Sequence, residues 1–333
     1  MKRLITLAAS VVLCAGLTYS QNDVQSAAAK AAEALSQAQE QTKVIDKPQY
    51  WFTSADLALG FNQTGLFSWA AGGYSTLSLA TGADLKANYA KNLSSWNNRL
   101  QLDYGFLWSA DKANLLQKSK DRIYLESKWT HKTSNESKWR YTAEFDFRTQ
   151  FTDSYDSYTQ NEETKKWEGK LKSSLLAPAN ITVSLGMDWE PTDWFNVTLS
   201  PLTGGIVICT VPELRKAYGM KVNTNNDEPY GTVFHSTLFQ IGAQIKTNFK
   251  VSINDKFKYE TQLVLFTDYL DKPFVNNRVN WDNKIRWQVA KHIAIGFDTW
   301  LIYDPIVLID GKNKVQFKEF LTVDFNLGFS NKR

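Results

Sequence analysis

The stretch from Val315 to Phe329 alternates apolar and polar side chains along its whole length. Its odd-numbered positions are nearly all apolar, and its even-numbered positions are nearly all polar or small. Successive side chains of a strand leave opposite faces, so a period of two predicts a β-strand with one apolar face. Repeated around a closed antiparallel sheet with the apolar face outward, this pattern is typical of a transmembrane β-barrel.

The same alternation begins after Trp51 and continues almost to the end of the chain. We expect an all-β fold, an antiparallel transmembrane β-barrel of about 12 strands over residues 51–333, preceded by a short helical leader. The predicted strands are 55–63, 76–89, 95–108, 121–130, 138–151, 181–189, 194–200, 234–250, 257–269, 277–289, 293–303 and 315–329. Their connections alternate between short and long, as do the periplasmic turns and extracellular loops of outer-membrane barrels.

The amino terminus has the composition of a secretory signal peptide over residues 1–20, with two basic residues and then a short apolar run. Residues 21–50 are rich in Ala, Gln and Glu, which favours a short periplasmic helix that Pro48 ends. This leader is either a spacer or, over residues 21–47, a surface that binds an envelope protein. The predicted location is the outer membrane, with outer-membrane lipid as the surrounding partner.

The composition excludes several classes of function. A formal net charge of +4 with both signs mixed along every segment does not suit nucleic-acid binding. Removal of the signal peptide leaves Cys209 as the only cysteine, so the chain cannot form an internal disulfide. Clusters of His or Cys at metal-ligand spacing are absent from the sequence, so we expect neither a metal nor a cofactor.

Aromatic residues gather at the ends of the predicted strands. Two aromatic girdles mark the two interfaces of a membrane barrel, whereas the aromatics of a soluble β-sandwich form its core. We assign the following residues to the membrane interfaces: Trp96, Trp108, Trp129, Trp139, Trp189, Trp287, Tyr269 and Tyr303.

Charged residues occupy the strand face opposite the apolar one. Charges inside a barrel must be solvated or paired, so they form either an ion-pair network or a polar conduit for a charged solute. The predicted lumen network comprises Arg99, Asp103, Arg122, Glu126, Lys128, Arg140, Glu144, Asp146, Arg148, Arg278, Asp282, Lys284 and Arg286.

The histidines are the candidates for catalysis. We expect His131 and His292 in solvated turns, and His235 on the lipid-facing side of the strand over 234–250. A hydrolase acting on lipid needs a nucleophile beside such a base, but Ser236 points to the opposite face from His235. We therefore predict no catalytic residues.

The predicted loop over residues 201–233 carries four apolar residues, Ile206, Val207, Ile208 and Val211. An apolar extracellular segment needs cover. It either folds into the barrel mouth or meets a partner protein.

Several short motifs resemble a family of outer-membrane proteins from the Bacteroidetes group, known only as domain of unknown function 3078. The resemblance rests on the motifs at 68–73, 96–98, 102–105, 200–204, 218–219, 265–266, 280–281 and 301–304. It implies an outer-membrane barrel and lends no activity. Pro305 departs from the acidic residue that we expect after Asp304, which argues against ion binding by that loop.

Together these features favour a non-enzymatic outer-membrane barrel, either a narrow or gated channel or an accessory or structural component of the envelope. The alternatives are an outer-membrane enzyme acting on lipid and a scaffold subunit of a secretion or assembly complex.

Overall fold

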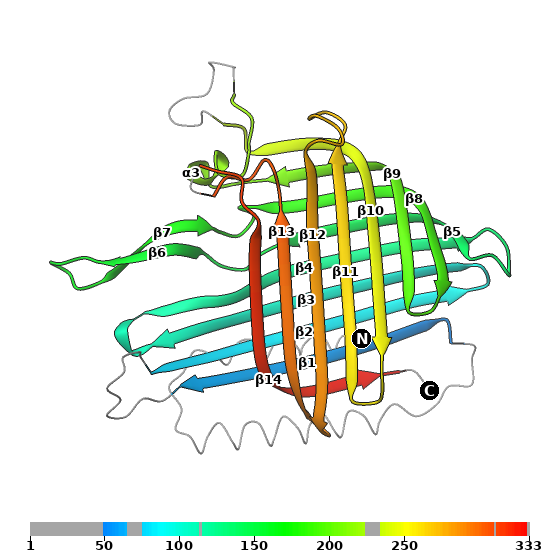
Figure 1. Ribbon diagram of the computed structural model, residues 1–333, viewed down its shortest axis with the longest axis horizontal. Helices are drawn as coiled ribbons and strands as arrows, with labels where there is room; N and C mark the ends of the chain where they lie inside the picture. Colours follow the sequence, from blue (N-terminus) through cyan, green and yellow to red (C-terminus); the bar gives the residue numbers. More distant parts are fainter. Residues whose placement is uncertain (1–48, 65–74, 113–114, 224–233, 310, 332–333) are drawn as a thin grey trace. The chain divides into compact units, whose positions relative to one another are not determined.

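Twelve antiparallel strands form a closed barrel in the computed structural model, which describes residues 49–64, 75–112, 115–223, 234–309 and 311–331 (Figure 1). The order around the barrel is β1-β14-β13-β12-β11-β10-β9-β8-β5-β4-β3-β2. The predicted strand number and antiparallel closure are confirmed, whereas the signal peptide and the helical leader lie outside the described residues. The barrel strands are β1 (Trp51–Thr64), β2 (Thr76–Lys91), β3 (Ser94–Ser109), β4 (Leu116–Lys132), β5 (Trp139–Thr149), β8 (Ala179–Thr192), β9 (Phe195–Ile208), β10 (Thr237–Ser252), β11 (Phe257–Asp268), β12 (Asn277–Ala290), β13 (Ile293–Tyr303) and β14 (Gln316–Ser330).

The barrel is polar inside and apolar outside. On β10, Gln240, Gln244 and Lys246 are buried, while the alternate residues Phe239 and Ile245 are exposed. Exposed apolar side chains continue around the outer wall, so the buried side of the sheet is the charged one. Of the helices among the described residues, none is long and apolar enough to cross a membrane.

The two rims of the barrel differ in their connections. One rim, here called the short-turn rim, joins β2 to β3, β4 to β5, β8 to β9, β10 to β11 and β12 to β13 by connections of a few residues. The opposite rim, called the long-loop rim, carries the longer connections, as the alternation of loop lengths predicts.

The connection from β5 to β8 contains a hairpin that the sequence analysis did not predict. Strands β6 (Ser154–Gln160) and β7 (Trp167–Ser173) pair with each other in a separate two-stranded sheet. Figure 1 shows this hairpin extending away from the barrel strands. The predicted loop over 152–180 is therefore partly folded.

Strand β9 is longer than predicted. It continues to Ile208, so the apolar residues Ile206, Val207 and Ile208 belong to the barrel wall and not to an extracellular loop. The prediction ended at Ser200 because Pro201 cannot donate to a strand ladder. The pairing of β9 with both neighbours shifts register around this proline, and a Cβ at Gly186 on β8 would lie 2.0 Å from the Leu199 carbonyl oxygen. A β-bulge and a close backbone approach thus accommodate the proline.

Strand β14 divides its length between two neighbours. Its first part pairs with β13, from Gln316↔Ile302 to Phe325↔Ile293, and its last part pairs with β1, from Val323↔Phe61 to Ser330↔Ser54. Figure 1 shows β14 running beside β13 and then turning to run beside β1. The barrel is closed by this β1–β14 seam.

The two ends of the barrel meet at the short-turn rim. The Gln49 side chain donates to the Asn331 carbonyl oxygen at 3.1 Å, and the Thr53 N–H donates to the Asn331 side chain at 2.7 Å. These hydrogen bonds tie the first described residues to the last ones.

Candidate functional site

A buried lysine organises one half of the barrel interior. The Lys246 ammonium, from β10, contacts the Glu144 carboxylate of β5 and lies 3.3 Å from Glu126 of β4 and 3.5 Å from Asp146 of β5. The Tyr124 hydroxyl donates to Asp146 at 2.7 Å. Lys246 is only 1% exposed at its side chain, so its charge is balanced by these carboxylates and not by bulk water.

The same three carboxylates, Glu126, Glu144 and Asp146, lie close enough together to hold a metal ion. The Lys246 ammonium already contacts all three of them. A cation is therefore built into the site, and this geometry favours an ion-pair cluster over a metal centre.

Arginine–carboxylate pairs organise the other half of the interior. Arg99 of β3 binds Asp84 of β2 through two nitrogens, with Nη2 at 2.6 Å. Arg122 of β4 pairs with Asp103 of β3 at 2.9 Å. Arg286 of β12 pairs with Asp298 of β13 at 2.5 Å. Pairs between neighbouring strands of this kind fix the side chains against the wall.

Other ion pairs join strands that are not neighbours in the sheet. Arg99 on β3 reaches Glu260 on β11 at 2.7 Å. Arg122 on β4 lies 3.7 Å from Asp282 on β12, and Lys120 on β4 lies 3.5 Å from Asp298 on β13. Because the joined strands face each other across the barrel, these pairs bridge the lumen.

Cation–π contacts also fill the lumen between the strands. The Arg122 guanidinium lies 5.9 Å from the Trp300 ring centroid, and that of Arg148 lies 5.4 Å from it. Arg148 also lies 4.8 Å from the Tyr124 ring. Long charged side chains and aromatic rings therefore occupy the space between the opposite walls.

The thirteen predicted lumen residues all lie on the inner face of the barrel. Most of them belong to the paired groups above, whereas Arg140 sits near the short-turn rim with Glu190 and Arg278 near the long-loop rim with Asp304. Lys128 pairs with Asp188 at 3.0 Å. Six of the partners that the sequence analysis did not name have even numbers within predicted strands, so the same alternation could have found them: Asp84, Asp188, Lys246, Glu260, Asp298 and Asp324. Lys120, Glu190 and Asp304 lie just outside the predicted strands.

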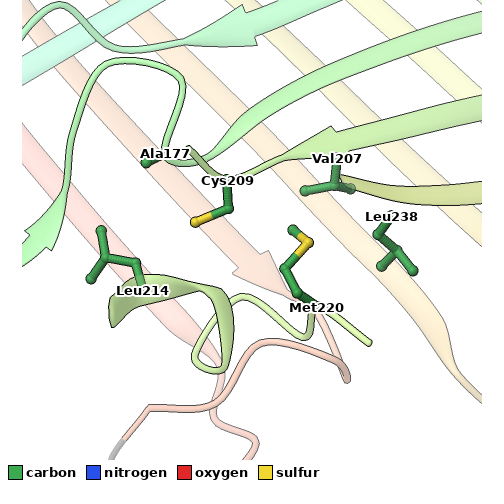
Figure 2. Close-up of a cluster of buried hydrophobic side chains, with 6 residues drawn as sticks. All are labelled: Ala177, Val207, Cys209, Leu214, Met220 and Leu238. Atoms are coloured by element: carbon green, nitrogen blue, oxygen red, sulfur yellow. The ribbon is translucent and has the colours of Figure 1, made fainter. Parts of the chain in front are cut away.

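An apolar cluster covers part of the lumen at the long-loop rim. We call it the mouth cluster, and Figure 2 shows its six buried side chains. Val207 and Leu238 face inward from the ends of β9 and β10, and Leu214 comes from the short helix α3 (Pro212–Arg215). The members are Ala177, Val207, Cys209, Leu214, Met220 and Leu238.

Several loops are tied to the mouth cluster. The Arg215 guanidinium donates to the carbonyl oxygens of Cys209 at 3.1 Å and Phe234 at 3.0 Å. Ile306, from the connection between β13 and β14, packs against the cluster, and a Cβ at Gly219 (φ +72°) would lie 2.7 Å from its carbonyl oxygen. Two arrangements were expected for the apolar loop: folding into the barrel mouth or contact with a partner protein. The packing of residues 207–220 in the mouth cluster agrees with folding into the barrel mouth.

Two titratable groups of this region are shielded from water. Burial raises the pKa of the Cys209 thiol, whose side chain is fully buried. Burial also raises the pKa of Tyr218 to about 12, and its hydroxyl donates to the Lys172 carbonyl oxygen at 2.9 Å. Both groups are thus neutral at physiological pH, which suits an apolar cap.

The aromatic residues assigned to the membrane interfaces lie at or near strand ends on both rims. Trp96, Trp129, Trp139, Trp189, Trp287 and Tyr269 are exposed, whereas Trp108 and Tyr303 are half-buried. Some of the rings at the short-turn rim contact each other. The ring centroids of Trp139 and Trp189 lie 6.3 Å apart, and those of Trp51 and Trp96 lie 5.9 Å apart. Aromatic rings of neighbouring strands therefore contact each other in groups along this rim.

The histidines do not form a catalytic arrangement with the residues described. His235 precedes β10, is exposed and donates its backbone N–H to Lys221, so its predicted place on a lipid-facing strand is wrong. His131 was expected in a turn but lies within β4. Its Nδ1 is 2.8 Å from the Ser94 hydroxyl oxygen. His292 lies in the turn before β13, as predicted, with its ring 5.7 Å from that of Phe325.

The fold and the interior define the class: a closed antiparallel barrel with a charged lumen and an apolar outer wall. Residues 29–155 match the family described as Protein of unknown function (DUF3078). The predicted resemblance is confirmed over that stretch, and the motifs quoted beyond residue 155 lie outside the match. Among curated proteins, none matches the sequence.

Similar solved structures include other barrels. An outer membrane channel from Pseudomonas putida F1 has a TM-score of 0.36 at 10% identity, covering 86% of this chain and 100% of that chain. The translocator domain of autotransporter NalP from Neisseria meningitidis has a TM-score of 0.33 at 8% identity, covering 92% and 97%. The Pseudomonas putida toluene transporter TodX has a TM-score of 0.32 at 8% identity, covering 85% and 90%. All three scores are below 0.5, so the barrel is defined here by its own strand pairing.

Proposed function

We propose that this chain is an integral outer-membrane β-barrel whose lumen is closed at rest. It serves the envelope as a narrow, gated channel or as a structural component, and not as an open diffusion pore. The observation that carries this proposal is the set of ion pairs that bridge the lumen, Arg99–Glu260, Arg122–Asp282 and Lys120–Asp298.

The outer wall supports a membrane location. Apolar side chains such as Phe239, Leu321 and Val323 are more than half exposed on it, which is costly in water and favourable in hydrocarbon. The β1–β14 pairing over residues 54–61 and 323–330 also closes the sheet on itself, and a strand-built protein that crosses a bilayer is a closed barrel. The expected signal peptide over residues 1–20 would deliver the chain to the periplasm, from which outer-membrane barrels insert.

The barrel size supports a closed state. Barrels of about eight strands are filled by side chains and barrels of 16–18 strands hold an aqueous channel, so twelve strands are intermediate. Here long side chains of opposite charge meet between the walls. A buried ion pair that loses one partner leaves an uncompensated charge, so opening the lumen requires these pairs to exchange for water or for a solute.

Reconstitution into planar bilayers tests this proposal. Wild-type protein should conduct far less than a general porin of known single-channel conductance measured in the same bilayer. The double variant Arg99→Gln, Arg122→Gln removes two of the bridges and should raise the conductance. A wild-type barrel that conducts like the general porin would overturn the closed lumen.

Two observations bear on the other functions. The lipid-hydrolase alternative depended on His235, which lies outside the barrel strands. The apolar residues of the partner-binding surface expected over 201–233 lie in β9 or pack in and against the mouth cluster. A role as a scaffold subunit then rests on residues 21–47.

A further inference from the structure

A row of polar side chains crosses the apolar outer wall. Thr261 of β11 pairs in register with Asn283 of β12, which pairs with Thr299 of β13. Thr299 in turn pairs with Glu319 of β14. We call these four residues the polar row. They face outward, because side chains alternate along a strand and Asp298, next to Thr299, points into the lumen.

Apolar side chains border the polar row on both sides. The next outward positions on β12, β13 and β14 are all aromatic or aliphatic: Trp281, Leu301 and Phe317 towards the long-loop rim, and Ile285, Phe297 and Leu321 towards the short-turn rim. Phe317 and Leu321 are 62% and 61% exposed. Glu319 therefore lies within the apolar surface and not at its edge. A charged side chain in such a place is costly in a bilayer unless a partner compensates it.

The polar row keeps hydrogen-bonding groups that the barrel itself does not use. The Tyr259 hydroxyl donates to the Asn283 side-chain oxygen at 2.8 Å. Among the described residues, the Asn283 amide nitrogen donates to no acceptor, and the side chains of Thr299 and Glu319 have neither a hydrogen bond nor an ion pair. The free groups are thus an amide donor, a hydroxyl and a carboxylate on three adjacent strands.

Another outward carboxylate shows the contrast. Asp121 of β4 pairs in register with Tyr104, whose ring is exposed on the outer face. The Lys118 ammonium lies 2.7 Å from the Asp121 carboxylate, and the Phe151 N–H donates to that carboxylate at 2.7 Å. The chain thus compensates one carboxylate of its outer wall internally, whereas Glu319 depends on something outside the barrel.

We propose that the polar row is the centre of a homodimer interface in the outer membrane. The inference rests on the proposed membrane location, since lipid tails offer neither donors nor acceptors to these side chains. A partner must therefore supply both kinds of group at the same depth in the membrane. A second copy supplies both, because the donors of Asn283 and Thr299 lie on the strands next to the Glu319 acceptor.

The order of the residues in the row suits a twofold axis. In a dimer whose axis is parallel to the barrel axis, each copy presents the same surface to the other. With the axis beside β13, β14 of one copy lies opposite β12 of its partner. Glu319 then accepts a hydrogen bond from the partner's Asn283, and Thr299 faces the partner's Thr299. Polar side chains of this kind associate spans within a bilayer, and the apolar residues around the row pack against each other.

Disulfide crosslinking tests this proposal. Full-length Thr299→Cys protein is reconstituted into phosphatidylethanolamine–phosphatidylglycerol vesicles and oxidised with copper phenanthroline. The matched control is Val183→Cys, an outward position that is 51% exposed on β8, which β12, β11, β10 and β9 separate from β13. The buried Cys209 is present in both variants, so it contributes equally to both. Heat-modifiable migration on gels reports folding, and Leu301→Cys replaces Thr299→Cys should that variant not fold.

We expect a disulfide-linked dimer from Thr299→Cys and none above background from Val183→Cys. Adding Glu319→Leu should abolish the dimer, whereas adding Glu319→Gln, which keeps an acceptor, should preserve it. A crosslink that is absent, equal at both positions or unaffected by Glu319→Leu would overturn the dimer interface. A crosslink from Thr299→Cys to a different protein in cell outer membranes, without the homodimer, would also overturn it.

Flotation of the vesicles separates these failures from a failure of the proposed membrane location. Protein that does not float with the vesicles overturns the membrane location. Protein that floats as a folded barrel without the Thr299→Cys crosslink overturns the dimer interface alone.

Discussion

Replacing Lys246 with Met tests how far the buried ion pairs hold the barrel together. The substitution keeps a long side chain but removes the charge that contacts Glu144, Glu126 and Asp146. Breaking a buried pair by removing one partner costs about 3–5 kcal/mol, because the remaining charge loses its compensation. We expect the upper part of this range, since three carboxylates share the one ammonium and Glu144 is itself only 2% exposed.

The assay is urea-induced unfolding of the barrel in detergent micelles, followed by the fluorescence of its 12 tryptophans. The matched control is Lys250→Met on the same strand and the same face, where the side chain is exposed and the expected loss is below about 0.5 kcal/mol. The double variant Lys246→Met, Glu144→Gln should lose less than the sum of the single variants, by about 0.5–3 kcal/mol. Equal losses for Lys246→Met and Lys250→Met would refute the structural role of the cluster.

Three further predictions concern the wall and the mouth. Leu263→Arg places a charge on the outward face of β11 and should lower the free energy of unfolding by about 2–4 kcal/mol if the residue lies near the bilayer midplane. Gln262→Arg, on the inward face, should lower it much less. Unfolding in lipid vesicles measures both values, and equal losses of stability would show that the assignment of inward and outward faces is wrong. The buried Cys209 thiol, with its raised pKa, should react slowly with maleimide in the folded protein, and Leu214→Asp should speed the reaction by opening the mouth cluster while the strand content in circular dichroism stays unchanged. Tyr218 has a pKa of about 12 in the folded chain, above the ordinary value of about 10 for tyrosine, so its stabilising effect is complete below pH 10 and is lost as the pH rises from 10 through 12. Tyr218→Phe should abolish that part of the alkaline loss of stability, and an unchanged alkaline profile would contradict the shift.

The alternation of side chains was sufficient to predict the strands of the barrel because every wall strand separates an apolar outer surface from a charged interior. It also placed residues such as Arg99 and Glu144 on the inner face. It could not identify their partners, because Arg99 and Glu260 are 161 residues apart and meet only when the barrel closes. The alternation of residues shows which face of the strand a side chain occupies. It does not show which side chains of other strands lie across the lumen from it.

The features that the sequence analysis missed have local causes. The hairpin β6–β7 lies outside the barrel, so its side chains need not alternate between an apolar outer wall and a charged lumen. On β7 the charged residues Glu168, Lys170 and Lys172 are simply exposed. The predicted strand ended before Pro201, whereas β9 continues past it because Gly186 on the neighbouring strand β8 allows a close backbone approach at the bulge. Such compensation between strands is not visible in a single stretch of sequence.

The hydrogen bonds that join Gln49 and Thr53 to Asn331 have a consequence for the linear order of the chain. Because the first and last residues of the barrel lie side by side, a short peptide could link them without distorting β1 or β14. New ends could then be made in the turn between β4 and β5, where residues 134–136 are exposed. The closed barrel therefore does not depend on which hairpin comes first in the chain. A circular permutant opened at that turn would have its termini beside Trp129 and Trp139.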